Sequence, residues 1–336
     1  MTDTIVIDTT SKSSSTGGAN VPVTNTSLNK YNFLNLLAYV VNASVTFGIG
    51  VDGKYRSILA PFGPSFIIWT VIFVWQAIWV LWQFLPSQRN SEGVERAWYY
   101  YPIMTFWQTV WTVSYLYDIM WLSLICMYFI LITLVMTSMS LQKYSKTWKG
   151  YLLWQGPISI NTGWIMAAAA VSTNSFAVAV EATATTQLIL SSLSLVVLLG
   201  TAFTWLCSYP VDFAIPLVIV WALGGIYGEL QNPSQIVLEE FTTRQINGVQ
   251  SGVLAGLYLS SFGIIVKILY VLLKQRPDSM KKKIHEEEQK GSSVYVSAPS
   301  SASASASAAS AAAAATSASA SASASSSQEE EEEEAV

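Results

Sequence analysis

Long apolar runs, separated by short polar turns, occupy most of the chain between residues 33 and 273. Because unpaired backbone amides are very costly in hydrocarbon, an apolar run of roughly 20 residues in a bilayer should form a helix. A polar turn around Asp118 separates the third run from the fourth. The pattern predicts an all-α integral membrane protein with about eight transmembrane helices, at 33–50, 64–86, 100–117, 119–141, 152–179, 186–207, 210–228 and 249–273.

Composition and charge agree with a bilayer as the solvent. Of the 336 residues, 52% are hydrophobic and 11% are charged, whereas about 25% of a soluble protein is charged. Nine basic and nine acidic residues lie between 31 and 273, so this apolar body is neutral. After residue 273, ten acids against six bases account for the net charge of -4. We therefore expect the lipid bilayer as a partner, and no nucleic acid.

Lysine and arginine are distributed unevenly between the two sides of the predicted bundle. Eight spans place both termini on one side, and that side collects thirteen basic residues against three on the other. The positive-inside rule then predicts a multi-pass protein with both termini in the cytoplasm. The sequence does not say which membrane holds it.

Five segments are expected along the chain. They are a disordered cytoplasmic N-terminus at 1–30, a first group of five helices at 31–180, three additional transmembrane helices at 181–273, a juxtamembrane segment of bases and acids at 274–291, and a disordered Ser/Ala-rich tail ending in poly-Glu at 292–336. The tail contains too few apolar residues to bury a core.

Few side chains in the apolar body can perform acid–base or metal chemistry. The histidine of the chain, His285, lies in the tail, and the acids Asp118, Glu181, Asp212 and Glu229 lie at the ends of predicted spans. The sequence contains neither a Gly-rich phosphate loop nor a nucleophilic Ser elbow. We therefore expect no enzyme, no catalytic residues, no metal site and no required cofactor.

Tryptophan is the most informative residue type, with 13 copies. Trp75, Trp79 and Trp82 share one face of the second predicted helix, and Trp107 and Trp111 are one turn apart in the third. These stripes have two interpretations: aromatic packing between helices or toward lipid, or the wall of a slot for a flat apolar ligand.

In residues 61–73, prolines precede a Phe and an apolar-Trp pair, a pattern similar to the second-helix signature of the TspO/translocator protein family of tryptophan-rich sensory proteins. Gln108-Thr109-Val110-Trp111 resembles the third-helix Asn-x-x-Trp, with Gln in place of Asn. Pro157-Ile158-Ser159 followed by Gly163-Trp164 resembles the fifth-helix motif. The matches occur in the family's order, so the first five helices resemble a TspO-type five-helix bundle, and the chain resembles an extended multi-span member.

The resemblance implies a pocket and a lid. In the family, the bundle binds porphyrins, sterols and other flat apolar molecules, and the loop after the first helix closes the pocket. The family's asparagine beyond the fifth-helix Trp falls on Ser172 here, and Asn174 follows two positions later. The implied ligand-binding residues are Trp69, Gln108, Trp111, Trp164 and Asn174, and the implied lid at 51–63 carries Asp52, Lys54 and Arg56.

The leading hypothesis is therefore a TspO-like membrane protein that binds a planar hydrophobic small molecule for sensing or transport without covalent chemistry. A porphyrin and a sterol are the candidate ligands, and a second copy of the chain, forming a homodimer, is a candidate partner. One alternative is a secondary transporter or channel that uses all eight helices, for which a continuous polar path is expected. A second alternative is a membrane scaffold whose disordered cytoplasmic tail recruits partners.

Overall fold

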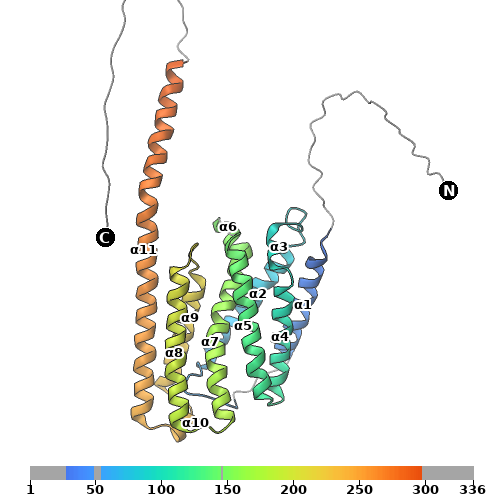
Figure 1. Cartoon of the computed structure of the whole chain (residues 1–336), viewed down its shortest axis with the longest axis vertical. Coiled ribbons are helices and arrows are strands. Elements are labelled where there is room, and N and C mark those ends of the chain that lie inside the picture. The colour runs from blue at the N-terminus through green and yellow to red at the C-terminus, as the bar shows by residue number, and fades with distance from the viewer. Residues whose placement is uncertain (1–27, 49–53, 145–146, 297–336) are drawn as a thin grey trace, which may run out of the picture. The chain divides into compact units, whose positions relative to one another are not determined.

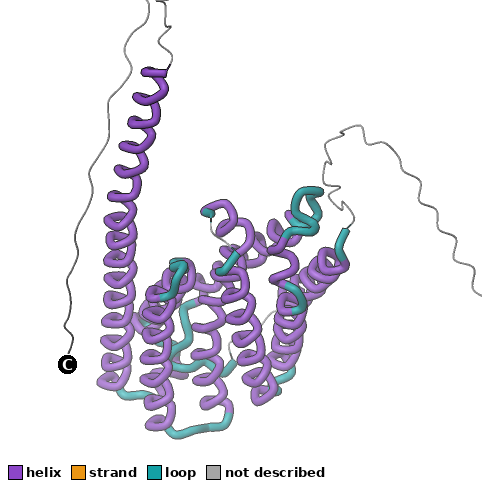
Figure 2. Tube along the Cα trace, turned by 45° about the horizontal axis from the view of Figure 1, so that its top comes forward, coloured by secondary structure: helices purple, strands orange, loops and turns teal. Residues whose placement is uncertain are grey.

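A computed structural model describes residues 28–48, 54–144 and 147–296, and all regular structure within these ranges is helical (Figures 1 and 2). The chain divides into two compact units, residues 1–276 and 277–336. Both predicted groups of helices belong to the first unit. The predicted disorder of 1–27 and 297–336, and lid residue Asp52, lie outside the described residues.

A helix lies at each of the eight predicted ranges, accompanied by three short helices. The long helices are α1 Lys30–Gly48, α2 Ile68–Trp82, α4 Tyr100–Leu116, α5 Met120–Gln142, α7 Gly156–Ala179, α8 Ala184–Cys207, α9 Ala214–Gln231 and α11 Thr243–Val296. The 3-10 helix η1 Gly63–Ile67 precedes α2, and the π-helical turn η2 Tyr151–Gln155 precedes α7. The short helices are α3 Glu92–Ala97, α6 Trp148–Gly150 and α10 Gln235–Glu240. Residues 274–296 are the end of α11.

Five helical segments of the described chain are long and apolar enough to cross a bilayer. They are η1 with α2, α5, α8, α9, and α11 as far as Lys274. The other three predicted spans are more polar or shorter: α1 buries Asn32, Asn35 and Asn42, α4 has 17 residues, and α7 is rich in Ser, Thr and Asn. Over the residues that the structure describes, the protein is therefore an all-helical membrane protein with five candidate spans, and the number eight stays a prediction.

Helix α7 lies at the centre of the first unit, which explains its polarity. It packs against α2, α5, α8 and α9, and Figure 1 shows it among the other long helices. A helix enclosed by protein needs small and hydrogen-bonding residues more than it needs apolar surface. Gly163 is one such residue, because a Cβ there would lie 2.9 Å from the Ile215 carbonyl oxygen and from Val218 Cβ. Glycine thus allows α7 and α9 to approach closely.

The tryptophan stripe of α2 packs between helices. The Trp79 ring contacts Tyr101 and Trp154 with centroids 4.7 and 6.3 Å away, and its side chain is 1% exposed. Trp75 Nε1 donates to the Leu152 carbonyl at 3.0 Å. On α4, Trp107 stacks on Phe129 at 4.5 Å. Aromatic packing between helices is the correct interpretation for these three rings.

Helix α9 begins four residues later than Pro210, where its predicted range starts. The fully buried Asp212 accepts hydrogen bonds from Tyr151 Oη at 2.7 Å, Gln155 Nε2 at 2.9 Å and Ser159 Oγ, and from the Ala214 backbone amide at 3.0 Å. The carboxylate thus serves the first free amide of α9 and joins this end of the helix to η2 and α7. The N-cap residue itself, Phe213, makes no side-chain cap hydrogen bond, so the contact from Asp212 comes from the residue before it.

Candidate ligand cavity

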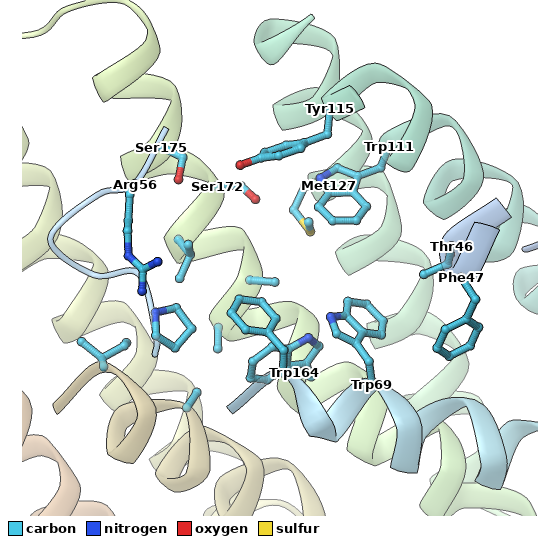
Figure 3. Close-up of a pocket in the computed structure, with 17 residues that line it drawn as sticks. Thr46, Phe47, Arg56, Trp69, Trp111, Tyr115, Met127, Trp164, Ser172 and Ser175 are labelled. Atoms are coloured by element: carbon cyan, nitrogen blue, oxygen red, sulfur yellow. The ribbon is translucent and has the colours of Figure 1, made fainter. Parts of the chain in front are cut away.

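A cavity of about 530 Å³ lies in the first unit between α1, α2, α4, α5, α7 and α9 (Figure 3). Its 17 lining residues are mostly aromatic or aliphatic. They include Phe47 of α1, Phe66 of η1, Trp69 of α2, Trp111 and Tyr115 of α4, Met127 of α5, Trp164, Ser172 and Ser175 of α7, Ala222 and Ile226 of α9, and Arg56 and Pro61 from the segment between α1 and η1.

Edge-to-face ring contacts form one wall of the cavity. Trp69 meets Trp164 with ring centroids 6.2 Å apart and planes at 83°, and Phe66 meets Trp164 at 5.7 Å and 85°. Such contacts each contribute about 0.5–1.5 kcal/mol beyond simple area burial. The three rings come from η1, α2 and α7, and their mutual contacts stabilise these orientations. Figure 3 shows the Trp111 ring on the far side of the cavity from this wall.

Polar groups lie among the aromatic rings at specific points. The indole Nε1 atoms of Trp111 and Trp164 are buried and have no hydrogen-bond partner among the described residues. The hydroxyl groups of Tyr115, Ser172 and Ser175 lie together at the opposite end of the cavity from Trp164 (Figure 3). A ligand that fills the cavity would thus meet apolar walls and a few directional hydrogen-bonding groups, as in most small-molecule sites.

The described part of the predicted lid, from Lys54 onward, is tied down at several points. Arg56 Nη2 forms an ion pair with Glu229 Oε2 on α9 at 2.6 Å, and Lys54 Nζ forms one with Asp118 Oδ2 at 2.5 Å. The hydrogen bond from Lys54 to Asp118 raises the pKa of the Lys54 ammonium group. The pair is exposed to solvent, so it contributes little to stability.

Backbone and apolar contacts hold the lid more firmly. The Phe62 amide donates to the Gly225 carbonyl at 3.1 Å, and Trp221 Nε1 donates to the Ser65 carbonyl at 3.0 Å. Leu59 is fully buried in the apolar core that contains α8 and α9. The segment from Lys54 to η1 is therefore packed against α9.

Four of the described residues implied by the family resemblance line the cavity: Trp69, Trp111, Trp164 and Arg56. The remaining three do not. Gln108 is buried one turn before Trp111, and its Oε1 has no partner among the described residues. Lys54 points to Asp118.

Asn174 faces α8. Its Nδ2 donates to Ser194 Oγ at 2.9 Å, and its Oδ1 accepts from Ser191 Oγ at 2.8 Å. The neighbouring Ser172 and Ser175 line the cavity. At 100° per residue, a shift of two positions turns the side chain toward another neighbour. Asn174 therefore joins α7 to α8.

Sequence reasoning did not identify the α9 wall. Ala222 and Ile226 are ordinary apolar residues of a predicted span, and nothing in the sequence marks them as lining residues. Tyr115 was identifiable in principle, because it follows Trp111 by four positions and so lies on the same face of α4. Its ring packs against Trp111 with centroids 5.8 Å apart.

The arrangement is suited to binding. Within the described ranges, no group of three His, Cys, Asp or Glu residues is placed to hold a metal ion. The cavity itself offers aromatic surface, hydroxyl groups, indole N–H donors and one guanidinium. These groups can enclose an apolar molecule and hydrogen-bond its polar atoms.

Comparison with known proteins gives one result. The model of a family described as TSPO-like protein matches residues 30–246, from α1 to the first turn of α11. Comparison with curated proteins finds no match, and neither does comparison with solved structures. The matched region covers more than half of the chain and contains every lining residue of the cavity. The chain belongs to the family of TSPO-like proteins.

Proposed function

We propose that this membrane protein binds a planar hydrophobic molecule, such as a tetrapyrrole or a sterol, and acts in sensing or transport without covalent chemistry. The observation that carries the proposal is the cavity of about 530 Å³ with Trp69, Trp111 and Trp164 in its walls. Its volume falls within the roughly 300–1,000 Å³ of typical small-molecule sites.

The physical basis of binding is shape and stacking. Large aromatic rings give a flat ligand extensive contact at a small cost in conformational entropy, and those of Trp69 and Trp164 already have fixed orientations. The lining supplies no histidine, so a tetrapyrrole would be held by its faces and edges.

Quenching of intrinsic Trp fluorescence tests the proposal. Protoporphyrin is titrated into purified protein in detergent, with Trp111→Ala and Trp164→Ala as the cavity variants. The matched control is Trp121→Ala, because Trp121 is 59% exposed on α5 and is not a lining residue. Each cavity variant should bind about tenfold more weakly, corresponding to the loss of about 1.4 kcal/mol of contact energy. Equal affinity in all four proteins would remove both tryptophans from the site.

A secondary transporter that uses all the long helices is the second candidate. The contribution of Ala222 and Ile226 favours it, because α9 lies among the additional helices after residue 181. Liposomes that contain the protein would distinguish transport from sensing. Accumulation of protoporphyrin inside them, dependent on Trp164, supports transport, whereas saturable binding without accumulation supports a sensor.

A further inference from the structure

We infer that Arg56 is an anion anchor, so that the cavity selects hydrophobic molecules that carry a carboxylate over neutral molecules of the same shape. The inference rests on the proposed function and specifies the class of its ligand. It assigns a role to Glu229 as well, as the residue that positions the Arg56 guanidinium and competes with the ligand for it.

Arg56 brings charge to the cavity. Among the 17 described residues that line the cavity, it is the one with a charged side chain. Its side chain is 31% exposed, and in Figure 3 it extends along the cavity wall formed by the segment between α1 and η1. A guanidinium in such a partly buried position attracts carboxylates more strongly than one in open solvent does.

The unpartnered polar atoms of the described cavity lining are all of one kind. Among the lining residues, three buried side-chain atoms have no hydrogen-bond partner within the described ranges: Arg56 Nε, Trp111 Nε1 and Trp164 Nε1. All three are N–H donors. Buried donors that stay unpaired are costly, so the complementary ligand should present acceptor atoms. Hydrophobic molecules with oxygen acceptors fit this pattern, and the charge of Arg56 favours carboxylates among them.

The geometry of the Arg56–Glu229 pair leaves part of the guanidinium for a ligand. Glu229 contacts the guanidinium through Nη2 at 2.6 Å, which leaves other donors of the fork, including Nε, for a second acceptor. Glu229 is 11% exposed and sits on α9, so it holds the guanidinium in place. Its negative charge also opposes a ligand carboxylate that approaches the same group. Removing that charge should therefore strengthen the binding of acids.

The test compares protoporphyrin with its dimethyl ester, which has the same ring system without the negative charges. Both are titrated by Trp fluorescence quenching into wild type, Arg56→Gln, Arg56→Lys and Glu229→Gln in detergent. In wild type the acid should bind about tenfold more tightly than the ester, near the lower end of what a hydrogen bond to a charged group contributes. Arg56→Gln should abolish the preference and leave the affinity for the ester within about twofold of wild type.

The two other variants separate recognition from structural damage. Arg56→Lys keeps the charge, so it should keep part of the preference. Glu229→Gln should raise the affinity for the acid about threefold and leave the ester unchanged. A variant that merely loosened the lid would weaken both ligands together.

Three outcomes would overturn the inference. Acid and ester could bind wild type equally, which would leave the proposed function standing and remove the anchor. Arg56→Gln could weaken both ligands equally, which would make Arg56 a structural residue. In the third outcome, neither ligand binds wild type or any variant, which would refute the proposed function and the anchor together.

Discussion

Replacing Gly225 with alanine should force the lid segment away from α9. A Cβ at this position would fall on the Ser65 hydroxyl and would lie 2.8 Å from Ser65 Cβ and 3.1 Å from Pro61 Cβ. Ser65 is 1% exposed, so it has little room to turn aside. The displacement would also stretch the hydrogen bond from the Phe62 amide to the Gly225 carbonyl.

The magnitude follows from three contributions. Overpacking by one methyl group costs about 2 kcal/mol, and a weakened hydrogen bond costs about 1 kcal/mol. Alanine in place of glycine within a helix raises the free energy of unfolding by about 1 kcal/mol. Gly225→Ala should therefore lower the free energy of unfolding by about 2 kcal/mol. Gly224→Ala is the matched control, because its Cβ would make an ordinary 3.9 Å contact with Leu257, and it should be stabilised by about 1 kcal/mol.

The assay is titration with SDS of each protein in mild detergent, followed by circular dichroism. The two variants should differ by about 3 kcal/mol, the sum of the packing and hydrogen-bond losses. Combining Gly225→Ala with Ser65→Gly removes most of the obstructing atoms and should recover most of the loss. If Gly225→Ala unfolds like Gly224→Ala, the close packing of the lid on α9 is wrong.

Three further substitutions test the rest of the architecture with the same titration. Asp212→Asn places amide hydrogens against buried donors and should lower the free energy of unfolding by about 2–3 kcal/mol. Wild-type stability of this variant would contradict the hydrogen-bond network around Asp212. Trp79→Ala should cost about 3–5 kcal/mol, while protoporphyrin affinity stays at the wild-type value because Trp79 does not line the cavity; weaker binding would show otherwise. Gly163→Ala should separate α7 from α9 and cost about 1–3 kcal/mol. Gly200→Ala is the control for Gly163→Ala, because a Cβ at position 200 would have no atom within 4 Å.

Helix positions followed from the sequence because an apolar run in a bilayer has one way to satisfy its backbone. The same rule failed at finer detail. It placed the start of α9 at Pro210, whereas the helix begins at Ala214, after the buried Asp212 that hydrogen-bonds to η2, α7 and the Ala214 amide. It also gave no sign that α7 is enclosed by protein, a position that requires the small and polar residues of this helix.

For the cavity, the family motifs identified Trp69, Trp111 and Trp164, because each motif keeps a large ring at a fixed place in its helix. The stripe of Trp75, Trp79 and Trp82 looked equally suitable as a ligand wall. In the structure this stripe packs against other helices. The sequence could not show this, because a row of rings on one helix face does not reveal what lies opposite it.

The sequence by itself determined the solvent, the helical class, the approximate helix positions and the family motifs, because these depend on local composition and spacing. The tertiary structure decided which faces meet. It brought α9 into the cavity wall, turned Asn174 toward α8, and paired Arg56 with Glu229 across 173 positions of sequence. Such pairings depend on rotations of about 100° per residue and on close approaches at a few glycines, and neither can be read from one helix alone.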